Sequence, residues 1–142
     1  MFLLDTNVVS ELRKVRGGKA DARVAAWAKS VDAADLYISV MTLQELDIVV
    51  LLMERRDEVQ GSMLRAWLEN VVLAAFAGRI LPVNEAVARR SARLHVPAPR
   101  PVRDGLIAAT ALVHRMTVVT RNVVDFAATG VSVINPWERR AS

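Results

Sequence analysis

Cysteine is absent from the 142-residue sequence. Its absence excludes disulfide bonds and zinc sites built from thiolates, and it suits a reducing compartment, so we expect a cytoplasmic protein. Histidine is scarce as well, because only His95 and His114 occur, each after a helical run and without the paired spacing of metal ligands. We therefore interpret both histidines as ordinary polar residues.

Long hydrophobic runs are also missing. The longest strongly apolar run is Ile48 to Met53, whereas a membrane-spanning helix needs about 20 apolar residues. The N-terminus does not have the basic segment and apolar segment of a signal peptide. No repeat, low-complexity tract or long linker divides the chain. We therefore expect a single domain over residues 1–142 and no membrane association.

The composition that remains is globular, with 53% apolar and 24% charged residues. The 19 Lys and Arg residues exceed the 15 Asp and Glu residues, so the net charge is 19 − 15 = +4. Basic residues concentrate in segments 13–23, 89–103 and 139–140. This surplus suits a partner with a phosphate backbone, although solvated helix faces produce the same pattern.

Apolar and β-branched runs alternate with helical periodicity along the chain. Strands are expected at residues 1–4, 36–40, 80–83, 117–120 and 130–134, helices at 8–14, 20–33, 42–56, 59–76, 85–94 and 106–112, and a turn or a single helical turn at 121–126. The alternation predicts an α/β fold with a mostly parallel sheet and helices on both faces. Trp27 and Trp67 lie on helical faces, so we interpret them as core residues and not as a base-stacking platform.

The helix expected after the second strand carries two patterns. Thr42 and Glu45 have the spacing of a capping box, with Thr42 as N-cap. Residues 46–53 are apolar almost all round the helix. We expect this helix to be buried on several sides and part of its surface to contact a second subunit.

At the N-terminus, four apolar residues lead directly into Asp5, Thr6 and Asn7. This pattern predicts a buried strand that ends at Asp5, with Thr6 and Asn7 suited to cap the next helix. In parallel α/β sheets, ligands bind outside the carboxyl ends of the strands. Asp5 therefore has two interpretations that this segment leaves open: a chemically active carboxylate and a helix cap.

Other polar residues occur at comparable positions, with Glu45 and Asp104 near helix starts and Asn122 and Asp125 after the fourth strand. The carboxyl ends of parallel strands meet at one edge, so these side chains can converge with Asp5. Clustered carboxylates repel one another, which raises their pKa values or requires a cation. Oxygen ligands without Cys or His favour Mg²⁺ or Mn²⁺ over zinc. Glu45 and Asp104 also have structural interpretations at helix starts, so spacing alone does not decide between a structural role and a metal site.

Four segments resemble, in order, the successive signatures of PIN-domain ribonucleases: residues 3–11 (LLDTNVVSE), 39–46 (SVMTLQEL), 104–111 (DGLIAATA) and 117–126 (TVVTRNVVDF). Residues 131–138 (VSVINPWE) resemble the FitB-like branch of the VapC toxins. The resemblance covers essentially the whole chain, and the joint pattern is specific although each segment alone is not.

The resemblance implies a single PIN domain with a three-layer α/β/α sandwich. It implies an endoribonuclease dependent on Mg²⁺ or Mn²⁺, in which a metal-activated water hydrolyses RNA phosphodiester bonds. Such an enzyme acts as the toxin of a type II toxin–antitoxin module. The implied partners are an RNA substrate, an inhibitory VapB-like antitoxin, and a second copy in a homodimer or a higher toxin–antitoxin assembly.

By the same resemblance, Asp5, Glu45 and Asp104 form an acidic triad that binds the metal and carries catalysis. The fourth position is open between two residues. Asn122 falls where many members of the family carry an acid, whereas Asp125 is the acid that this chain offers. We rank Asp125 slightly first, as a catalytic residue and metal ligand, because it can carry charge.

Three further residues near these positions bear on the site. Thr6 and Thr120 can orient carboxylates or water from the strand ends. Arg103 stands where relatives often have a small or acidic residue, and it can pair with the acids in the absence of metal or contact RNA. The proline-rich segment 95–101 before it also departs from the family pattern. The alternative function is a non-catalytic PIN-like module that binds RNA or protein.

Overall fold

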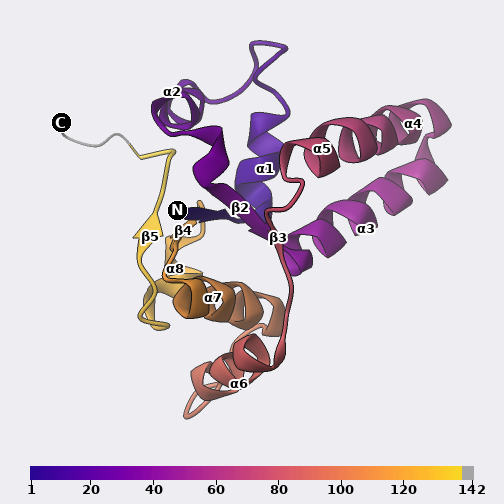
Figure 1. Ribbon diagram of the computed structural model, residues 1–142. Coiled ribbons are helices and arrows are strands. Elements are labelled where there is room, and N and C mark those ends of the chain that lie inside the picture. The colour runs from indigo at the N-terminus through magenta and orange to yellow at the C-terminus, as the bar shows by residue number, and fades with distance from the viewer. Residues whose placement is uncertain (139–142) are drawn as a thin grey trace.

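A parallel sheet forms the centre of the structure, a computed structural model that describes residues 1–138 (Figure 1). Its strands are β1 (Phe2–Leu4), β2 (Leu36–Ser39), β3 (Ile80–Leu81), β4 (Thr117–Val119) and β5 (Val133–Ile134). They lie in the order β3-β2-β1-β4-β5, and all neighbouring pairs are parallel. The predicted strands and the parallel sheet are confirmed, and β1 lies in the middle of the sheet.

Helices cover both faces of this sheet. One face carries α1 (Thr6–Leu12), α2 (Ala22–Ser30), α3 (Val40–Arg56), α4 (Glu58–Trp67), the π-helical η2 (Leu68–Val72) and α5 (Leu73–Ala75), and the other carries α6 (Glu85–Leu94), α7 (Val102–His114) and α8 (Val123–Ala127). The short 3₁₀ helix η1 (Ala33–Asp35) leads into β2. The α/β/α arrangement predicted from the alternation of elements is therefore confirmed.

Strand β1 connects the two hydrophobic cores because successive side chains of a strand point to opposite faces. Leu4 packs with Val8 and Leu46 in the core on the α1 and α3 side, and Leu3 packs with Ile107 in the core on the α7 side. Both leucines are 0% exposed. This burial holds the carboxyl end of β1, and therefore Asp5, in one place.

Three helices begin earlier than predicted. Ser39, and not Thr42, caps α3, since the Ser39 hydroxyl accepts from the Met41 N–H at 3.0 Å. Thr42 is buried inside the helix, so the predicted capping box is wrong. Asp5 itself caps α1, in place of Thr6 or Asn7.

Helix α7 begins at Val102, directly after Pro101, and not at Leu106. Pro101, the N-cap, has a fixed backbone φ and no backbone N–H that would require a partner, so the helix can start at the end of the proline-rich segment. The earlier start places Arg103 and Asp104 in the first helical turn.

Helices α3 and α4 form a hairpin that projects from the body of the molecule (Figure 1). Arg65 of α4 binds Asp47 and Glu54 of α3, both at 3.0 Å. Only Thr42, Leu46 and Val50 of α3 are buried, so the prediction of burial on several sides is wrong. The apolar surface of α3 is instead exposed, with the largest fractions at Val49 (51%), Leu51 (53%) and Leu52 (63%).

The interpretation of Trp27 and Trp67 as core residues agrees with their surroundings. Both are partly buried and pack against the core on the α1 and α3 side. The ring of Trp27 also meets Phe2 of β1 edge to face, with 5.5 Å between the ring centroids. Within residues 1–138, no helix combines the length and apolarity needed to cross a membrane.

Candidate functional site

Asp5 lies at the carboxyl end of β1, where its carboxylate accepts several hydrogen bonds. Oδ1 accepts from the Thr6 N–H at 2.8 Å, and Oδ2 accepts from the Thr120 hydroxyl at 2.8 Å. The Asn7 amide donates to Oδ2 at 3.4 Å. Asp5 is therefore both the cap of α1 and a fixed carboxylate at the sheet edge, so the two interpretations of this residue are compatible.

Asp5 is 6% exposed, and this burial raises the pKa of its carboxyl group above the ordinary value. The hydrogen bonds from Thr120 and Thr6 oppose this rise because they stabilise the anion. Repulsion from Asp125 raises the pKa further, and the positive charge of Arg103 lowers it. The anion at this position thus depends on its hydrogen-bond donors.

Glu45 reaches the same region from the second turn of α3. Its Oε1 accepts from the Thr6 hydroxyl at 2.9 Å. Its Oε2 forms an ion pair with Nη1 of Arg103 at 3.3 Å. Thr6 therefore connects Glu45 to the segment of Asp5, and Arg103 connects Glu45 to α7.

Asp104 extends from the first turn of α7. Burial raises its pKa, and repulsion from Asp5, Asp125 and Glu45 raises it further, whereas the charge of Arg103 lowers it. Asp104 therefore lies close enough to Asp5, Asp125 and Glu45 for their charges to raise its pKa, although these residues are far apart in the sequence. A crowded group of carboxylates of this kind favours a bound cation.

A polar hollow joins these residues. It has a volume of about 440 Å³, and it is lined by Asp5, Thr6, Asn7, Glu45, Pro101, Arg103, Asp104 and Asn122. Asp125 instead lines an adjoining hollow with Arg121, Asn122, Asn135 and Glu138. The structure therefore brings Asp5, Glu45, Asp104 and Asn122 together, and it leaves Asp125 close enough to influence them electrostatically.

A divalent metal fits the chemistry of this hollow. The side chains offer carboxylate and amide oxygens, which are the ligands that Mg²⁺ and Mn²⁺ prefer. Within residues 1–138, however, no three His, Asp or Glu side chains stand in a ligating arrangement. The two carboxylate oxygens of Glu45 are engaged by Thr6 and by Arg103.

Asn7 belongs to the site and was not predicted to have a role there. Its amide donates to the Thr120 hydroxyl at 3.2 Å as well as to Asp5, and its oxygen accepts from the Arg121 N–H at 3.2 Å. Asn7 thus fixes the chain after β4 against the start of α1. Its position two residues after Asp5, in the first turn of a helix at the sheet edge, is the signal that could have indicated this role.

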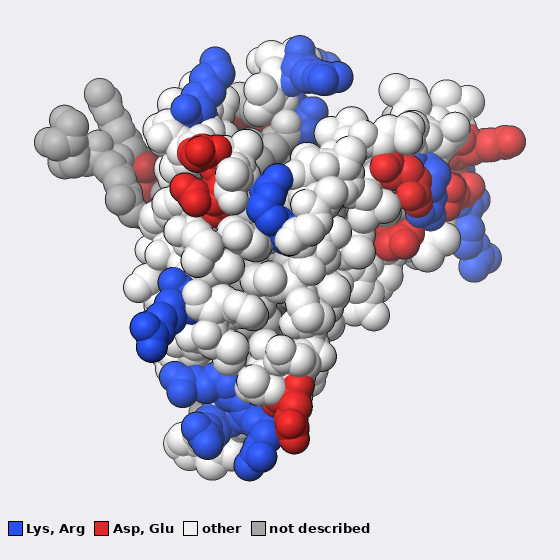
Figure 2. Space-filling view, viewed as in Figure 1, with Lys and Arg blue, Asp and Glu red and all other residues white. Residues whose placement is uncertain are grey.

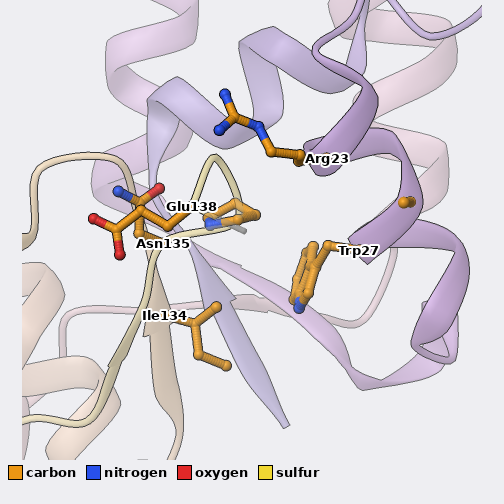
Figure 3. A pocket seen from close by; sticks show the side chains of 7 residues that line it. Arg23, Trp27, Ile134, Asn135 and Glu138 are labelled. Carbon is orange, nitrogen blue, oxygen red and sulfur yellow. The ribbon is translucent and has the colours of Figure 1, made fainter. Parts of the chain in front are cut away.

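A second, mainly apolar hollow of about 220 Å³ lies between α2 and the segment after β5. Figure 3 shows Trp27 and Arg23 on one side of it and Ile134, Asn135 and Glu138 on the other. It contains none of the predicted acidic residues. Because Trp27 packs against the core beside it, this hollow is a depression between packed elements at the edge of the sheet.

Charge is unevenly distributed over the surface. Figure 2 shows Lys and Arg gathered over α6 at the lower end of the view, and acidic and basic side chains side by side over the α3–α4 hairpin. Arg89, Arg90 and Arg93 of α6 are exposed. Since α6 packs along α7, which carries Asp104, this basic surface lies on the face of the sheet that α7 covers.

Comparison with known proteins agrees with this geometry. The chain is 41% identical to the protein named Toxin FitB of Neisseria gonorrhoeae, over 96% of this chain and 99% of that protein. It is 39% identical to the VapC ribonuclease Y4jK of Sinorhizobium fredii, over 97% of this chain and 99% of that protein.

Solved structures show the same similarity. The crystal structure of FitAcB from Neisseria gonorrhoeae matches with a TM-score of 0.88 and 40% identity, over 98% of this chain and 100% of that chain. The structure of FitAB bound to an IR36 DNA fragment matches with a TM-score of 0.89 and 38% identity, over 99% of both chains. The family model of the PIN domain matches residues 2–131. The chain therefore belongs to the PIN-domain family.

Proposed function

We propose that this protein is a metal-dependent endoribonuclease and the toxin of a type II toxin–antitoxin module, acting in the cytosol as one domain over residues 1–142. The ribonuclease names of relatives such as Y4jK support the activity. The observation that carries the proposal is the convergence of Asp5, Glu45 and Asp104, from three distant segments, in one polar hollow at the carboxyl edge of the sheet.

Asp5, Asp104 and Glu45 would hold the cation, with Asn122 or Asp125 as a fourth group. A bound Mg²⁺ or Mn²⁺ supplies a water of lowered pKa and offsets the negative charge that develops on a phosphate. The chain itself fixes Asp5 through Thr120, Asn7 and the Thr6 N–H. Of the two candidates for the fourth group, Asn122 lines the hollow, so it would contact a ligand there more directly than Asp125.

Exposed arginines on α6 and around the hollow would hold the RNA backbone through phosphate contacts. Preference among RNA molecules would come from their shape and unpaired bases, because protein side chains read single strands and loops more readily than A-form helices. RNA is therefore the proposed substrate, with the phosphodiester placed over the carboxylates.

The Asp5→Asn variant tests this function. The matched control is Asp57→Asn, because Asp57 caps α4 through its carboxylate in the same way but lies outside the hollow. We expect RNA cleavage to fall by roughly 10²-fold or more in the first variant, the scale observed when one preorganised group is removed, and to be retained in the control. Circular dichroism checks the fold, and undiminished Mn²⁺-dependent cleavage by folded Asp5→Asn protein would refute the assignment.

The proposed partners follow from the same similarity. A matched solved structure, 25% identical to this chain, is named a toxin–antitoxin complex from Klebsiella pneumoniae, and we propose that a VapB-like antitoxin occupies the polar hollow of this chain. An arginine from the antitoxin would match the carboxylates in charge and block metal or substrate. We also propose that the exposed apolar surface of α3 joins two copies in a homodimer, and that this homodimer binds the antitoxin in a higher toxin–antitoxin assembly.

The second candidate function is a non-catalytic PIN-like module that binds RNA or protein. The ion pair between Arg103 and Glu45 favours it, because this pair leaves fewer free carboxylates for a cation. Titration with Mn²⁺ separates the two functions. Stoichiometric binding that is lost in Asp5→Asn supports the nuclease, whereas the absence of Mn²⁺ binding supports the non-catalytic module.

A further inference from the structure

Among residues 1–138, Arg103 is the one cationic side chain that lines the polar hollow. It lies in the first turn of α7, next to Asp104, and its Nη1 is 3.3 Å from Oε2 of Glu45. Its side chain is 40% exposed, yet its Nε atom is buried and has no hydrogen-bond partner among the described residues. The guanidinium is therefore held in the hollow by its charge and does not have a complete set of hydrogen bonds.

The charge of Arg103 acts on the acids around it. It lowers the pKa of Asp5 and of Asp104, which opposes the effect of burial and of repulsion between the carboxylates. A positive charge that stabilises carboxylate anions at close range performs part of the electrostatic role of a bound cation. Arg103 is thus already a counter-ion for the hollow.

Glu45 is the acid that Arg103 engages directly. The other oxygen of Glu45 accepts from the Thr6 hydroxyl, so neither oxygen is free of a protein partner. A divalent ion that takes Glu45 as a ligand competes with Arg103 at Oε2, because the guanidinium and the metal carry the same sign of charge and repel each other across one carboxylate group.

We propose that Arg103 is an internal competitor of the divalent cation: it pairs with Glu45 in the metal-free protein and must release Glu45 when the metal binds. The inference rests on the proposed function, because it assumes that the hollow takes a metal. Arg103 is accordingly a positioning residue, which acts on the metal through Glu45.

Arg103 competes only weakly with the divalent cation for Glu45. An ion pair exposed to this extent is weak because solvent screens it, so a divalent ion can displace the guanidinium. We expect the Arg103→Gln variant to bind Mn²⁺ roughly two- to fivefold more tightly than the wild-type protein. The reason is that Glu45 is then available without the loss of an ion pair.

The measurement is titration of the purified chain with Mn²⁺ alone, followed by the electron paramagnetic resonance signal of free Mn²⁺. Arg89→Gln is the matched control, because Arg89 is exposed on α6 and takes part in none of the ion pairs found in residues 1–138. This control removes the same charge at a distance from the hollow, and its Mn²⁺ affinity is expected to stay at the wild-type value.

A double-mutant cycle with Glu45→Gln separates direct competition from a general effect of charge. If Arg103 acts through Glu45, the gain in affinity from Arg103→Gln largely disappears in the Glu45→Gln background. If the full gain persists there, Arg103 repels the metal without competing for Glu45, and the inference is overturned.

The same titrations distinguish failure of the inference from failure of the proposed function. Equal Mn²⁺ affinities of the wild-type and Arg103→Gln proteins overturn the inference and leave the function in place, provided that Asp5→Asn reduces binding. Mn²⁺ binding that is absent from the wild-type protein, or unchanged in Asp5→Asn, overturns the proposed function and the inference with it.

Discussion

A single carboxylate can be kept charged in a buried position only if other groups favour its anion. Asp5 meets this condition through Thr120, which is 0% exposed and donates from its hydroxyl to Oδ2. The same hydroxyl oxygen accepts from the Asn7 amide and from the Asn122 N–H. Thr120 therefore links the ends of β1 and β4 and supports the charge on which the proposed chemistry depends.

Replacement of this threonine by valine, Thr120→Val, should destabilise the protein by about 1 to 3 kcal/mol at pH 7, since it leaves buried polar groups without a partner. The pKa of Asp5 is raised in the folded protein and should rise further without the hydroxyl. Once Asp5 is protonated, no anion remains for the Thr120 hydroxyl to stabilise. The difference in free energy of unfolding from wild type should therefore shrink as the pH falls through the raised pKa.

Urea unfolding at several pH values between 4 and 7 measures this effect. The control is Thr110→Val, because Thr110 is equally buried but donates to the backbone oxygen of Leu106 and not to a carboxylate. The loss in free energy of unfolding caused by Thr110→Val should not depend on pH. A cost for Thr120→Val that is also independent of pH would show that Thr120 does not support the charged form of Asp5.

Much of the site could be predicted residue by residue, and what could not be predicted depends on contacts between distant segments. Asp5, Glu45 and Asp104 were noted at strand ends and helix starts, the resemblance to PIN-domain ribonucleases implied that they form a triad, and they do line one hollow. Pattern alone did not distinguish Asn122 from Asp125, because that choice depends on the turn after β4. Asn7 was missed because its role arises from contacts with Thr120 and Arg121, more than 100 residues away in the sequence.

At the scale of elements, the α3–α4 hairpin shows what sequence patterns cannot determine. The apolar residues of α3 were expected to be buried on several sides, with part of the surface against a second subunit, but periodicity reports hydrophobicity and not the presence of a neighbour. Arg65 of α4 instead links the two helices through ion pairs with Asp47 and Glu54 of α3. Similarly, the capping box failed because Ser39 offers a cap one turn earlier than Thr42.

The close packing of α3 and α4 gives a prediction at Gly61. A Cβ atom at this position would lie 2.4 Å from the Cα of Glu54, so backbone atoms of α3 would have to move. Gly61→Ala should therefore destabilise the protein, by about 1 to 3 kcal/mol as for other overpacked sites, even though alanine is the better helix former. Thermal and urea unfolding measure the change.

Gly17→Ala provides the control for this variant, because its nearest contact would be the Lys14 oxygen at 3.8 Å, an ordinary distance. We expect a small effect at Gly17. If Gly61→Ala were as stable as the wild-type protein, the two helices would be separated more widely than the structure shows.

At the scale of the whole molecule, the parallel sheet explains how distant residues form one site. Because β1 lies between β2 and β4, the segments that follow these three strands emerge side by side at one edge. They bring Asp5, Glu45 and Asn122, and α7 adds Asp104 beside them. The α3–α4 hairpin carries exposed apolar residues outside this site, and they are available to a partner.

The last prediction concerns this apolar surface, which includes Ile48, Val49, Leu51 and Leu52 of α3. Exposed apolar groups in a continuous patch favour association, and a second copy offers the same patch in a two-fold arrangement. Leu52, at 63% exposed, also lines a small hollow with Val49. A charge at its position would have to be desolvated in the interface, so Leu52→Glu should convert the dimer to a monomer.

Sedimentation velocity at micromolar concentration measures this conversion. Val96→Glu is the control, because Val96 is 75% exposed in the segment between α6 and α7 and lies outside the patch. It should leave the dimer intact, and both variants should melt near the wild-type temperature if the monomer is stable by itself. A wild-type protein that sediments as a monomer, or a Leu52→Glu protein that remains a dimer, would show that this surface of α3 does not join two copies.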